Sequence, residues 1–436
     1  MKEIGIGLLG LGTVGSGVVK AIAGNQLSIS GKLGAELQIK KILVQDLYKK
    51  RLVQVPQSLM TKDYQDIVND PTIDIVVDAM GGIEPAKDFI LAAMEKGKHV
   101  VTANKEVVAK YGREILDKAE VHGVTFLFEG SVGGGIPIIR PLKQCLVANE
   151  ITEISGIING TTNYILTKMA TEGKEFAAIL KEAQDKGYAE PDPTNDIEGF
   201  DAAYKLAILA SLAFGTPVKF EDVSFEGISN ITREDMAWAV ELGCTIKLLA
   251  QTKEHADGLE IRVGPCLIPL SHPLAGVNDV FNAFFIKGNL VGELFFSGRG
   301  AGDLPTGSAV VADIVEAARL TVTGSGAKPV CNCYRQKRVK PKDELLSAYY
   351  LRAKVTRSEV MLPVNNLLLQ EQVPFAQTVK RVQQGKGGNM VYLTEELEER
   401  QIHGIVSKLS AIPGVKEVSL MRLEGNQAGV GQVARV

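Results

Sequence analysis

Two opposite charges lie four residues apart in a segment that is otherwise mostly apolar. Asp201 and Lys205 belong to residues 198–214, where alanine, leucine, isoleucine and phenylalanine predominate. A helix over this segment is apolar nearly all round and is therefore expected to be buried. Buried charges are costly unless they are partnered, and ionisable groups with perturbed pKa values gather at active sites. We therefore reject the alternative of a surface ion pair. We predict that Lys205 transfers a proton and that Asp201 fixes the direction of the Lys205 side chain.

A glycine-rich motif follows the first apolar segment of the chain. Gly10-Leu11-Gly12-Thr13-Val14-Gly15 comes directly after the strand-like residues 4–9 and opens an apolar helix. In this context Gly10 permits a tight turn, Gly12 lets the backbone approach a pyrophosphate and Gly15 allows close helix packing. The free N–H groups of the helix N-terminus would face the anion. The motif predicts a bound dinucleotide, NAD or NADP.

The end of the next strand gives conflicting signals about which dinucleotide binds. Asp46 is placed to accept a ribose 2′-hydroxyl, whereas Lys49, Lys50 and Arg51 could accommodate a 2′-phosphate. The basic residues favour NADP over NAD, and the strand alone leaves both cofactors open.

Further polar residues follow two later strands. Gly81 and Gly82 follow residues 73–80, and Lys105 follows the strand-like residues 99–102. Ligands of open α/β sheets bind at the carboxyl ends of the strands, where these residues are expected to lie. Lys105 is therefore a further catalytic candidate.

An acidic loop precedes the helix that carries Lys205. Residues 187–196 contain Glu190, Asp192 and Asp196 together with two prolines and a glycine. Carboxylates in such a loop suit a substrate that carries an ammonium group.

Three regions of the chain position these residues. Residues 1–130 alternate short apolar strands with helices, which predicts an α/β fold with a Rossmann-type doubly wound parallel sheet, with about 300–322 returning to this domain. Residues 131–300 read as helices, from about 162 to 186 and from 198 to 214, followed by strands, which predicts an α+β domain. Residues 323–346 are a linker candidate. Residues 347–436 follow the βαββαβ order of a split-βαβ fold.

Composition narrows the classes of function. The formal charge of −3 leaves no global field for nucleic acid or an anionic membrane, so neither is an expected partner. The longest segments without charged residues span 16 residues and contain glycine or proline, short of the roughly 18 apolar residues of a membrane span. We expect no signal peptide, and the sparse, odd set of 5 cysteines favours a reducing cytoplasm. The histidines show no spacing typical of metal ligands.

Seven spaced motifs resemble those of the homoserine dehydrogenase family. They are GLGTVG, DAMGGIEPA, VVTANK, FEGSVGGGIPI, NGTTNYIL, GYAEPDPTNDIEGFDAAYKLAIL and GRGAGDLPTGSAV, and they run from residue 4 to about 320. The tail from Ser347 resembles the ACT domain that many bacterial members carry. The resemblance implies reversible, NADPH- or NADH-dependent reduction of L-aspartate 4-semialdehyde to L-homoserine, in threonine and methionine biosynthesis.

The resemblance also assigns roles to individual positions. Lys205 and Lys105 match the two catalytic lysines, with Lys205 as proton donor. The matching substrate positions are Glu190, which holds the amino group, and Thr161, Asp196 and Asp201. The matching cofactor positions are Gly10, Gly12, Thr13, Val14, Gly15, Gly81, Lys105, Gly187 and Gly302. In family members a sodium ion is surrounded at the positions of Glu129, Val132, Gly134 and Ile136, and glycine-rich backbone with one carboxylate suits such an ion. The resemblance further implies a homodimer or higher homo-oligomer, with residues 131–300 as the catalytic and dimerisation domain.

One departure from the family pattern concerns the tail. Effector-binding ACT domains usually carry an Asp-x-Pro-Gly-like turn, but residues 356–362 contain no glycine. Feedback by threonine therefore stays open. Two other functions remain in competition: a related NAD(P)-dependent amino-acid dehydrogenase, and a non-catalytic amino-acid sensor that would have no need of Lys205.

Overall fold

The computed structural model describes residues 1–323, 335–382 and 387–425. These residues form two compact units. The first comprises residues 1–160, 201–223 and 280–337, and the second comprises residues 161–200, 224–279 and 338–436. Cys331, Cys333 and much of the predicted linker at 323–346 lie outside the described residues. No described helix has both the length and the hydropathy needed to cross a bilayer.

The first unit begins with a parallel six-stranded sheet. Its strand order is β3-β2-β1-β4-β5-β6, so the chain reverses direction across the sheet between β1 and β4, as in the predicted doubly wound fold. The strands are β1 (Lys2–Leu9), β2 (Ala35–Leu43), β3 (Met60–Thr61), β4 (Ile75–Asp78), β5 (His99–Thr102) and β6 (Phe126–Leu127). The strand ends that follow β1 and β4 therefore meet at this switch point, which is where such sheets bind ligands.

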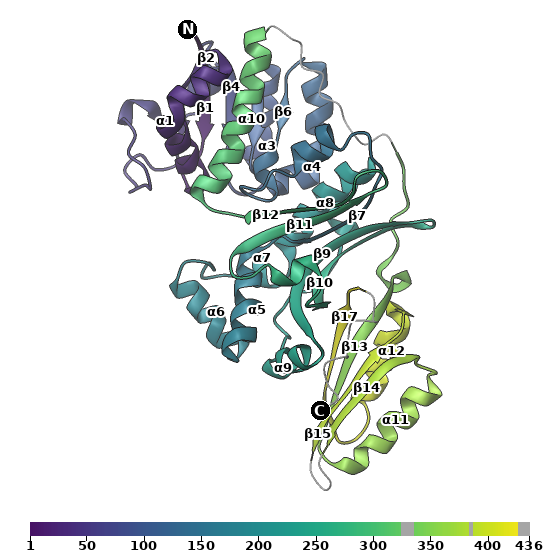
Figure 1. Ribbon diagram of the computed structural model, residues 1–436. Helices are drawn as coiled ribbons and strands as arrows, with labels where there is room; N and C mark the ends of the chain where they lie inside the picture. The colour runs from purple at the N-terminus through teal and green to yellow at the C-terminus, as the bar shows by residue number, and fades with distance from the viewer. Residues whose placement is uncertain (324–334, 383–386, 426–436) are drawn as a thin grey trace. The chain divides into compact units, whose positions relative to one another are not determined.

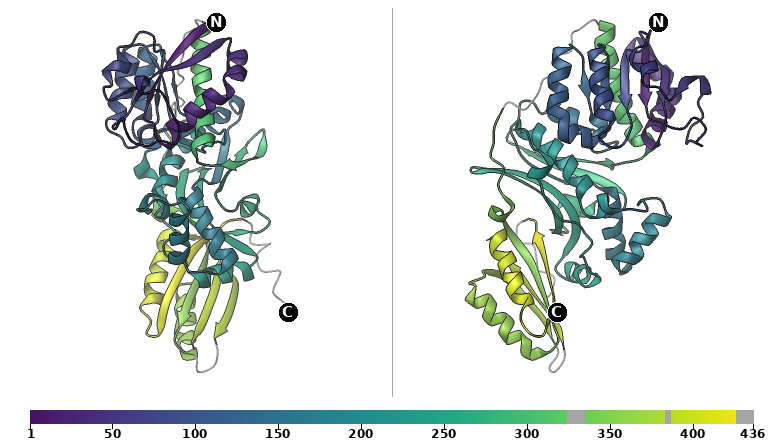
Figure 2. Two further views of the ribbon diagram at one scale, coloured as in Figure 1. Left: turned by 90° about the vertical axis from the view of Figure 1, so that its left-hand side faces the viewer. Right: turned by 180° about the vertical axis from the view of Figure 1, so that it is seen from behind.

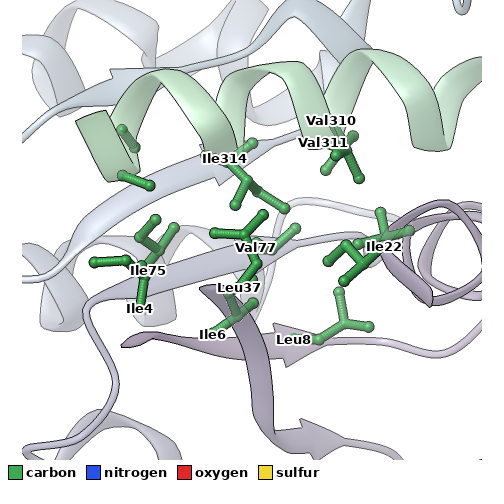
Figure 3. Packing of buried hydrophobic residues seen from close by; sticks show 14 of the residues in the cluster. Ile4, Ile6, Leu8, Ile22, Leu37, Ile75, Val77, Val310, Val311 and Ile314 are labelled. Atoms are coloured by element: carbon green, nitrogen blue, oxygen red, sulfur yellow. The ribbon is translucent and has the colours of Figure 1, made fainter. Parts of the chain in front are cut away.

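Five helices accompany this sheet, and one of them comes from much later in the chain. They are α1 (Thr13–Leu33), α2 (Gln65–Val68), α3 (Ala86–Glu95), α4 (Lys105–Val121) and α10 (Asp303–Thr323). Figure 3 shows Val310, Val311 and Ile314 of α10 packed against Ile75 and Val77 of β4 and their neighbours. Helix α10 thus completes the core of the first sheet.

Helices α1 and α10 lie side by side (Figures 1 and 2) and touch through glycine. A Cβ on Gly17 would lie 1.8 Å from the Asp303 carbonyl oxygen, and one on Gly307 would lie 2.6 Å from the carbonyl carbon of Gly17. No side chain fits at either position. Helix α1, the apolar helix predicted after the glycine-rich motif, ends where Gly34 adopts a left-handed conformation.

The rest of the first unit provides a second sheet region and the helix that carries Lys205. Strands β7 (Ile151–Ile157), β11 (Phe281–Gly288) and β12 (Gly292–Arg299) pair antiparallel in the order β12-β11-β7. Helix α8 (Phe200–Phe214) is largely buried, as its composition predicts. Short helical turns complete this part: η2 (Glu129–Ser131), the π-helical η3 (Pro141–Cys145) and η4 (Phe220–Asp222).

The second unit combines helices with a long hairpin. Its elements before the tail are α5 (Gly160–Glu172), α6 (Phe176–Asp185), α7 (Thr194–Ile197), β8 (Ser224–Phe225), α9 (Arg233–Glu241), β9 (Cys244–His255), β10 (Gly258–Pro269) and η5 (Pro273–Gly276). The sequence predicted helices from 162 to 186 without naming a break. The structure ends α5 before Gly173, whose positive φ of 62° terminates the helix.

The tail belongs to the second unit and follows the predicted strand and helix order. Its elements are η6 (Lys342–Glu344), β13 (Leu346–Val355), η7 (Ser358–Val360), α11 (Met361–Gln370), β14 (Phe375–Val382), β15 (Gly388–Thr394), β16 (Leu397–Glu398), α12 (Glu399–Ser410) and β17 (Val415–Leu423). Strands β17-β13-β15-β14 form an antiparallel sheet with α11 and α12 on one face (Figure 1). Strand β17 also pairs in parallel with β10, where Cys266 faces Arg422.

A buried arginine joins the tail to α9. The Arg352 side chain is fully buried, and its Nε donates to Asp235 Oδ1 at 2.7 Å. The same guanidinium reaches Glu234 and Glu417, and the Tyr350 hydroxyl donates to Asp235. Because a buried guanidinium is costly without such partners, this cluster fixes β13 against α9.

Candidate active site

Asp201 pairs with both predicted catalytic lysines within the first unit. Lys205 Nζ lies 2.7 Å from Asp201 Oδ2, and Lys105 Nζ lies 3.2 Å from Asp201 Oδ1. Lys205 also donates to the Ile158 carbonyl at 3.0 Å, and the Asn159 amide donates to Asp201 Oδ2 at 2.8 Å. One carboxylate therefore orients two ammonium groups and one amide.

Three elements bring these groups together. Lys205 and Asp201 lie one turn apart on α8, and Ile158 and Asn159 follow the end of β7. Lys105 is the first residue of α4, after the N-cap Asn104, whose side chain accepts a hydrogen bond from Val107. The N-terminus of a helix disfavours a cation, so the Asp201 carboxylate offsets this unfavourable position of Lys105.

The electrostatics of the site follow from burial and charge. Burial alone would raise the pKa of Asp201, but the charges of Lys205 and Lys105, together with hydrogen bonds from Lys205 and Asn159, lower it to about 2. Asp201 is therefore ionised at neutral pH. Only 12% of the Lys205 side chain is exposed, against 34% for Lys105. The less accessible lysine is thus the one held at two points.

The glycine-rich turn has the shape that a dinucleotide requires. Gly10 has a φ of +96°, and a Cβ there would lie 2.9 Å from the Ala79 carbonyl oxygen. A Cβ on Gly15 would lie 2.2 Å from the Gly10 carbonyl oxygen, whereas one on Gly12 meets nothing within 4 Å. Gly12 is the N-cap of α1 and offers no side chain to the helix N-terminus. Open space in front of uncapped N–H groups fits a pyrophosphate.

Arg51 lies beside this turn. Its guanidinium donates to the Leu11 carbonyl at 3.2 Å and to the Asp46 carbonyl. Its Nε is buried without a hydrogen-bond partner in the described part of the chain. The Asp46 carboxylate accepts the backbone N–H of Tyr48, and Lys49 and Lys50 are exposed. Of the three predicted cations, Arg51 is therefore the one held against the glycine loop.

The remaining cofactor positions lie in the first unit, except Gly187, which lies in the second. Gly81 follows β4, next to Gly82, whose carbonyl accepts the Asn104 amide at 2.6 Å. Gly302 precedes α10 and has a φ of +128°. Thr13 and Val14 form the first turn of α1.

The predicted substrate positions other than Asp201 lie in the second unit. The Thr161 hydroxyl donates to the Tyr188 carbonyl at 2.8 Å, which ties α5 to the acidic loop next to Gly187. Gln184 donates to the Glu190 carbonyl and leaves the exposed Glu190 carboxylate to solvent. Asp196 lies in α7. The structure therefore gathers these residues around one loop.

The predicted sodium loop has three buried carbonyls to offer. Val132, Gly134 and Ile136 are buried, and their carbonyls accept no hydrogen bond from the described residues. The Glu129 carboxylate is already committed, because it accepts the backbone N–H groups of residues 138–140 at 2.6–2.9 Å. The Glu129 carboxylate is thus held at this loop by backbone N–H groups, and its part in binding the ion stays a prediction. The carbonyl oxygens of the loop suit a hard monovalent cation. Within the described ranges, no three His, Cys, Asp or Glu residues gather as a metal site.

Two site residues escaped the sequence analysis. Asn159 fixes Asp201, and its only signal is its place in the motif NGTTNYIL after a strand. Asp313 of α10 is buried, accepts the Glu129 N–H at 2.8 Å and pairs with Arg140. Burial raises the pKa of Asp313 to about 7, against the hydrogen bond from Glu129. No local pattern in the sequence points to Asp313.

Two family models match most of the chain. The model described as "Homoserine dehydrogenase, NAD binding domain" matches residues 10–129, and the model described as "Homoserine dehydrogenase" matches residues 137–315. These ranges contain the glycine-rich turn, both lysines and Asp201.

Relatives and solved structures match over nearly the full length. A homoserine dehydrogenase of Bacillus subtilis is 42% identical over 98% of this chain and 99% of the relative. The crystal structure of a homoserine dehydrogenase from Thiobacillus denitrificans has a TM-score of 0.90 and 41% identity and covers 97% of this chain and 99% of that one. A hyperthermophilic archaeal homoserine dehydrogenase in complex with NADPH has a TM-score of 0.61 and 28% identity, over 75% of this chain and 100% of that one.

Proposed function

The chain belongs to the homoserine dehydrogenase family, an NAD(P)-dependent group of oxidoreductases, and from this premise we propose how its residues work. The reaction is the reversible reduction of L-aspartate 4-semialdehyde to L-homoserine. The bound nicotinamide supplies or accepts the hydride. Lys205 donates the proton to the oxygen of the forming alcohol and takes it back in the oxidation.

The arrangement around Asp201 carries this assignment. A lysine ammonium has three N–H donors, and Asp201 and the Ile158 carbonyl engage two of those of Lys205. The third remains for the substrate oxygen. Asp201 orients both lysines, and Lys105 adds positive charge where the oxygen becomes negative. Glu190, Asp196 and Thr161 would hold the amino group and backbone of the substrate.

Initial rates of homoserine oxidation test the role of Lys205. Proton-transfer groups contribute roughly 10²- to 10⁴-fold in rate, so Lys205→Met is expected to lose about that much of kcat. Lys181→Met on α6 is the matched control, because Lys181 forms an exposed pair with Asp185 at the same four-residue spacing and is expected to leave kcat unchanged. Near-normal turnover of Lys205→Met, with the cofactor KM intact, would overturn the assignment.

We propose that NADP is the preferred cofactor, with Arg51 contacting the 2′-phosphate. The support is the contact of Arg51 with the glycine loop and the unpartnered Nε. Hydrogen bonds to charged groups contribute about 1.5–3 kcal/mol, so Arg51→Gln is expected to lower kcat/KM for NADP by about 10- to 100-fold and to leave NAD little changed. Lys50→Gln is the control. Equal losses with both cofactors would refute the role.

We propose that a sodium ion occupies the loop of residues 129–136, with the carbonyl oxygens of Val132, Gly134 and Ile136 as ligands. Replacing sodium chloride by tetramethylammonium chloride at constant ionic strength is expected to lower the melting temperature. The same melting temperature in both salts would exclude a structural sodium ion.

The oligomer and the tail are assigned by family likeness. We propose a homodimer, and light scattering after size exclusion tests this through the molar mass.

The tail is proposed to be an ACT domain that binds threonine, and isothermal titration tests this binding. Flat titrations and flat inhibition curves at millimolar threonine would refute threonine as an effector.

A further inference from the structure

Buried guanidinium N–H groups without acceptors line a small cavity in the second unit, away from the residues assigned to catalysis. Arg262 of β10 is 6% exposed, and its Nε and Nη1 have no hydrogen-bond partner in the described part of the chain. Arg422 of β17 likewise leaves its buried Nη2 without one. Both arginines line the same cavity. Because unpaired buried donors are costly, these three N–H sites call for an acceptor.

The surroundings supply only part of what the arginines need. The Nη2 of Arg262 lies 2.6 Å from Glu260 Oε1, and Nη1 of Arg422 donates to Gln251 at 3.4 Å. Lys342 and Glu399, which also line the cavity, pair with each other at 3.3 Å. Lys342 and Glu399 therefore offset each other's charge, and Glu226 and His403 also line the cavity. The Nε and Nη1 of Arg262 and the Nη2 of Arg422 still have no acceptor among the described residues.

The size of the cavity limits the occupant. Its volume is about 30 Å³, roughly two to three times the 10–15 Å³ that one water molecule needs on this measure. Such a space suits the two oxygens of a carboxylate, and any larger substituent would have to point outward. Guanidiniums bind carboxylates through parallel N–H···O bonds, and a carboxylate presents two oxygens where a water presents one. We propose that this cavity binds the carboxylate of a small organic molecule between Arg262 and Arg422.

The position of the site links its occupancy to the attachment of the tail. Arg262 lies on β10 and Arg422 on β17, and these strands pair only at Cys266 with Arg422 and Leu267 with Leu423 within the described residues. Arg422 belongs to this short contact, and Arg262 precedes it on β10. A carboxylate that bridges them holds β17 against β10, and its loss loosens the junction.

Gly264 offers a way to block the cavity without removing a charge. A Cβ on Gly264 would lie 3.8 Å from both Arg422 Nη2 and Glu226 Cβ, at ordinary contact distance. Gly264 lies in strand β10, where valine is well tolerated. In Gly264→Val the added methyl groups occupy the space of the ligand, while both arginines stay in place.

Titration calorimetry of the full chain with sodium acetate, at constant ionic strength against sodium chloride, tests the proposal. We expect saturable binding of one acetate per chain. Arg262→Met and Gly264→Val should each weaken it by about 10- to 100-fold. The control Arg400→Met removes an arginine of α12 that is 71% exposed and should bind acetate like the parent. If Arg262→Met fails to fold, Gly264→Val still decides.

A parallel titration with the free amino acid glycine distinguishes two sources of the carboxylate, an amino acid and a simple carboxylic acid. Glycine that binds more tightly than acetate, with the difference lost in Glu226→Gln, identifies an amino acid held through its ammonium group. Equal affinities identify a simple carboxylic acid.

Hydrogen exchange gives a second readout. Acetate should slow exchange of the amides of residues 418–425, because it bridges β17 to β10. No saturable acetate binding, binding unchanged in both cavity variants, or saturation by phosphate alone would overturn the proposal and leave water as the occupant.

Discussion

Replacing Asp201 by asparagine tests whether one carboxylate organises the active site. The change keeps size and shape but leaves Lys205 and Lys105 without their shared counter-ion at 2.7 and 3.2 Å. The pKa of Asp201 drops from 3.8 to about 2 despite burial. At 1.36 kcal/mol per unit, the net interaction amounts to about 2 kcal/mol. Breaking a buried pair costs about 3–5 kcal/mol, because the remaining charge loses its partner. We therefore expect Asp201→Asn to lose about 2–4 kcal/mol of unfolding free energy at pH 7.

The sign of the pH dependence follows from the lowered pKa. Because the pKa of Asp201 is lower in the folded state than in the unfolded one, its contribution is present above pH 4 and is lost as the pH falls towards 2. The gap in stability between the parent and Asp201→Asn should therefore be full at pH 6 and shrink below pH 4. Urea denaturation at a series of pH values measures it.

Kinetics provide the second half of this test. Without the carboxylate, Lys205 loses the partner that orients its ammonium group, so kcat for homoserine oxidation should fall by about 10²-fold or more. Asp185→Asn is the matched control, because Asp185 pairs with Lys181 at 2.7 Å on an exposed helix face. It should lower the unfolding free energy by less than about 0.5 kcal/mol and leave kcat unchanged. Equal stability and an unchanged kcat in Asp201→Asn would refute the reasoning.

The remaining predictions concern the cofactor turn and the buried arginine. Gly12→Val should raise the cofactor KM at least about tenfold with little change in melting temperature, because the valine side chain fills open space. Gly15→Ala should lower the melting temperature, since the alanine Cβ would lie 2.2 Å from the Gly10 carbonyl oxygen. Asp235→Asn should lower the free energy of unfolding by about 3–5 kcal/mol, because Arg352 loses its buried partner. Urea denaturation measures this loss through the fluorescence of the single tryptophan, Trp238, which lies on the same helix. An unchanged free energy of unfolding would mean that the Arg352 cluster is dispensable.

The sequence predicted those features that local pattern determines. The alternation of short apolar strands with helices predicted the parallel sheet. The order of the strand-like and helix-like segments predicted the arrangement of the tail. The burial of α8 followed because residues 198–214 are apolar on all sides, and this made the Asp201–Lys205 pair a candidate site before any geometry was known. Glycine spacing located the turn between β1 and α1.

Contacts between distant residues left no comparable signal. Asp235 and Arg352 are separated by 117 residues, and each alone reads as a surface charge on an amphipathic element. The meeting of Arg262 with Arg422 is equally invisible, since it depends on parallel pairing of β10 with β17. The hydrogen bonds from the backbone N–H groups of residues 138–140 to the Glu129 carboxylate were likewise absent from the sequence pattern.

The packing of α10 on the first sheet has a consequence for synthesis on the ribosome. The sheet of residues 2–127 emerges early, but Val310, Val311 and Ile314, which cover its apolar face, are translated some 180 residues later. Until then the nascent nucleotide-binding domain exposes Ile75, Val77 and the Gly17 groove of α1. Its core is therefore completed only once α10 has been synthesised, and until then the exposed face is open to chaperones that bind apolar segments during elongation.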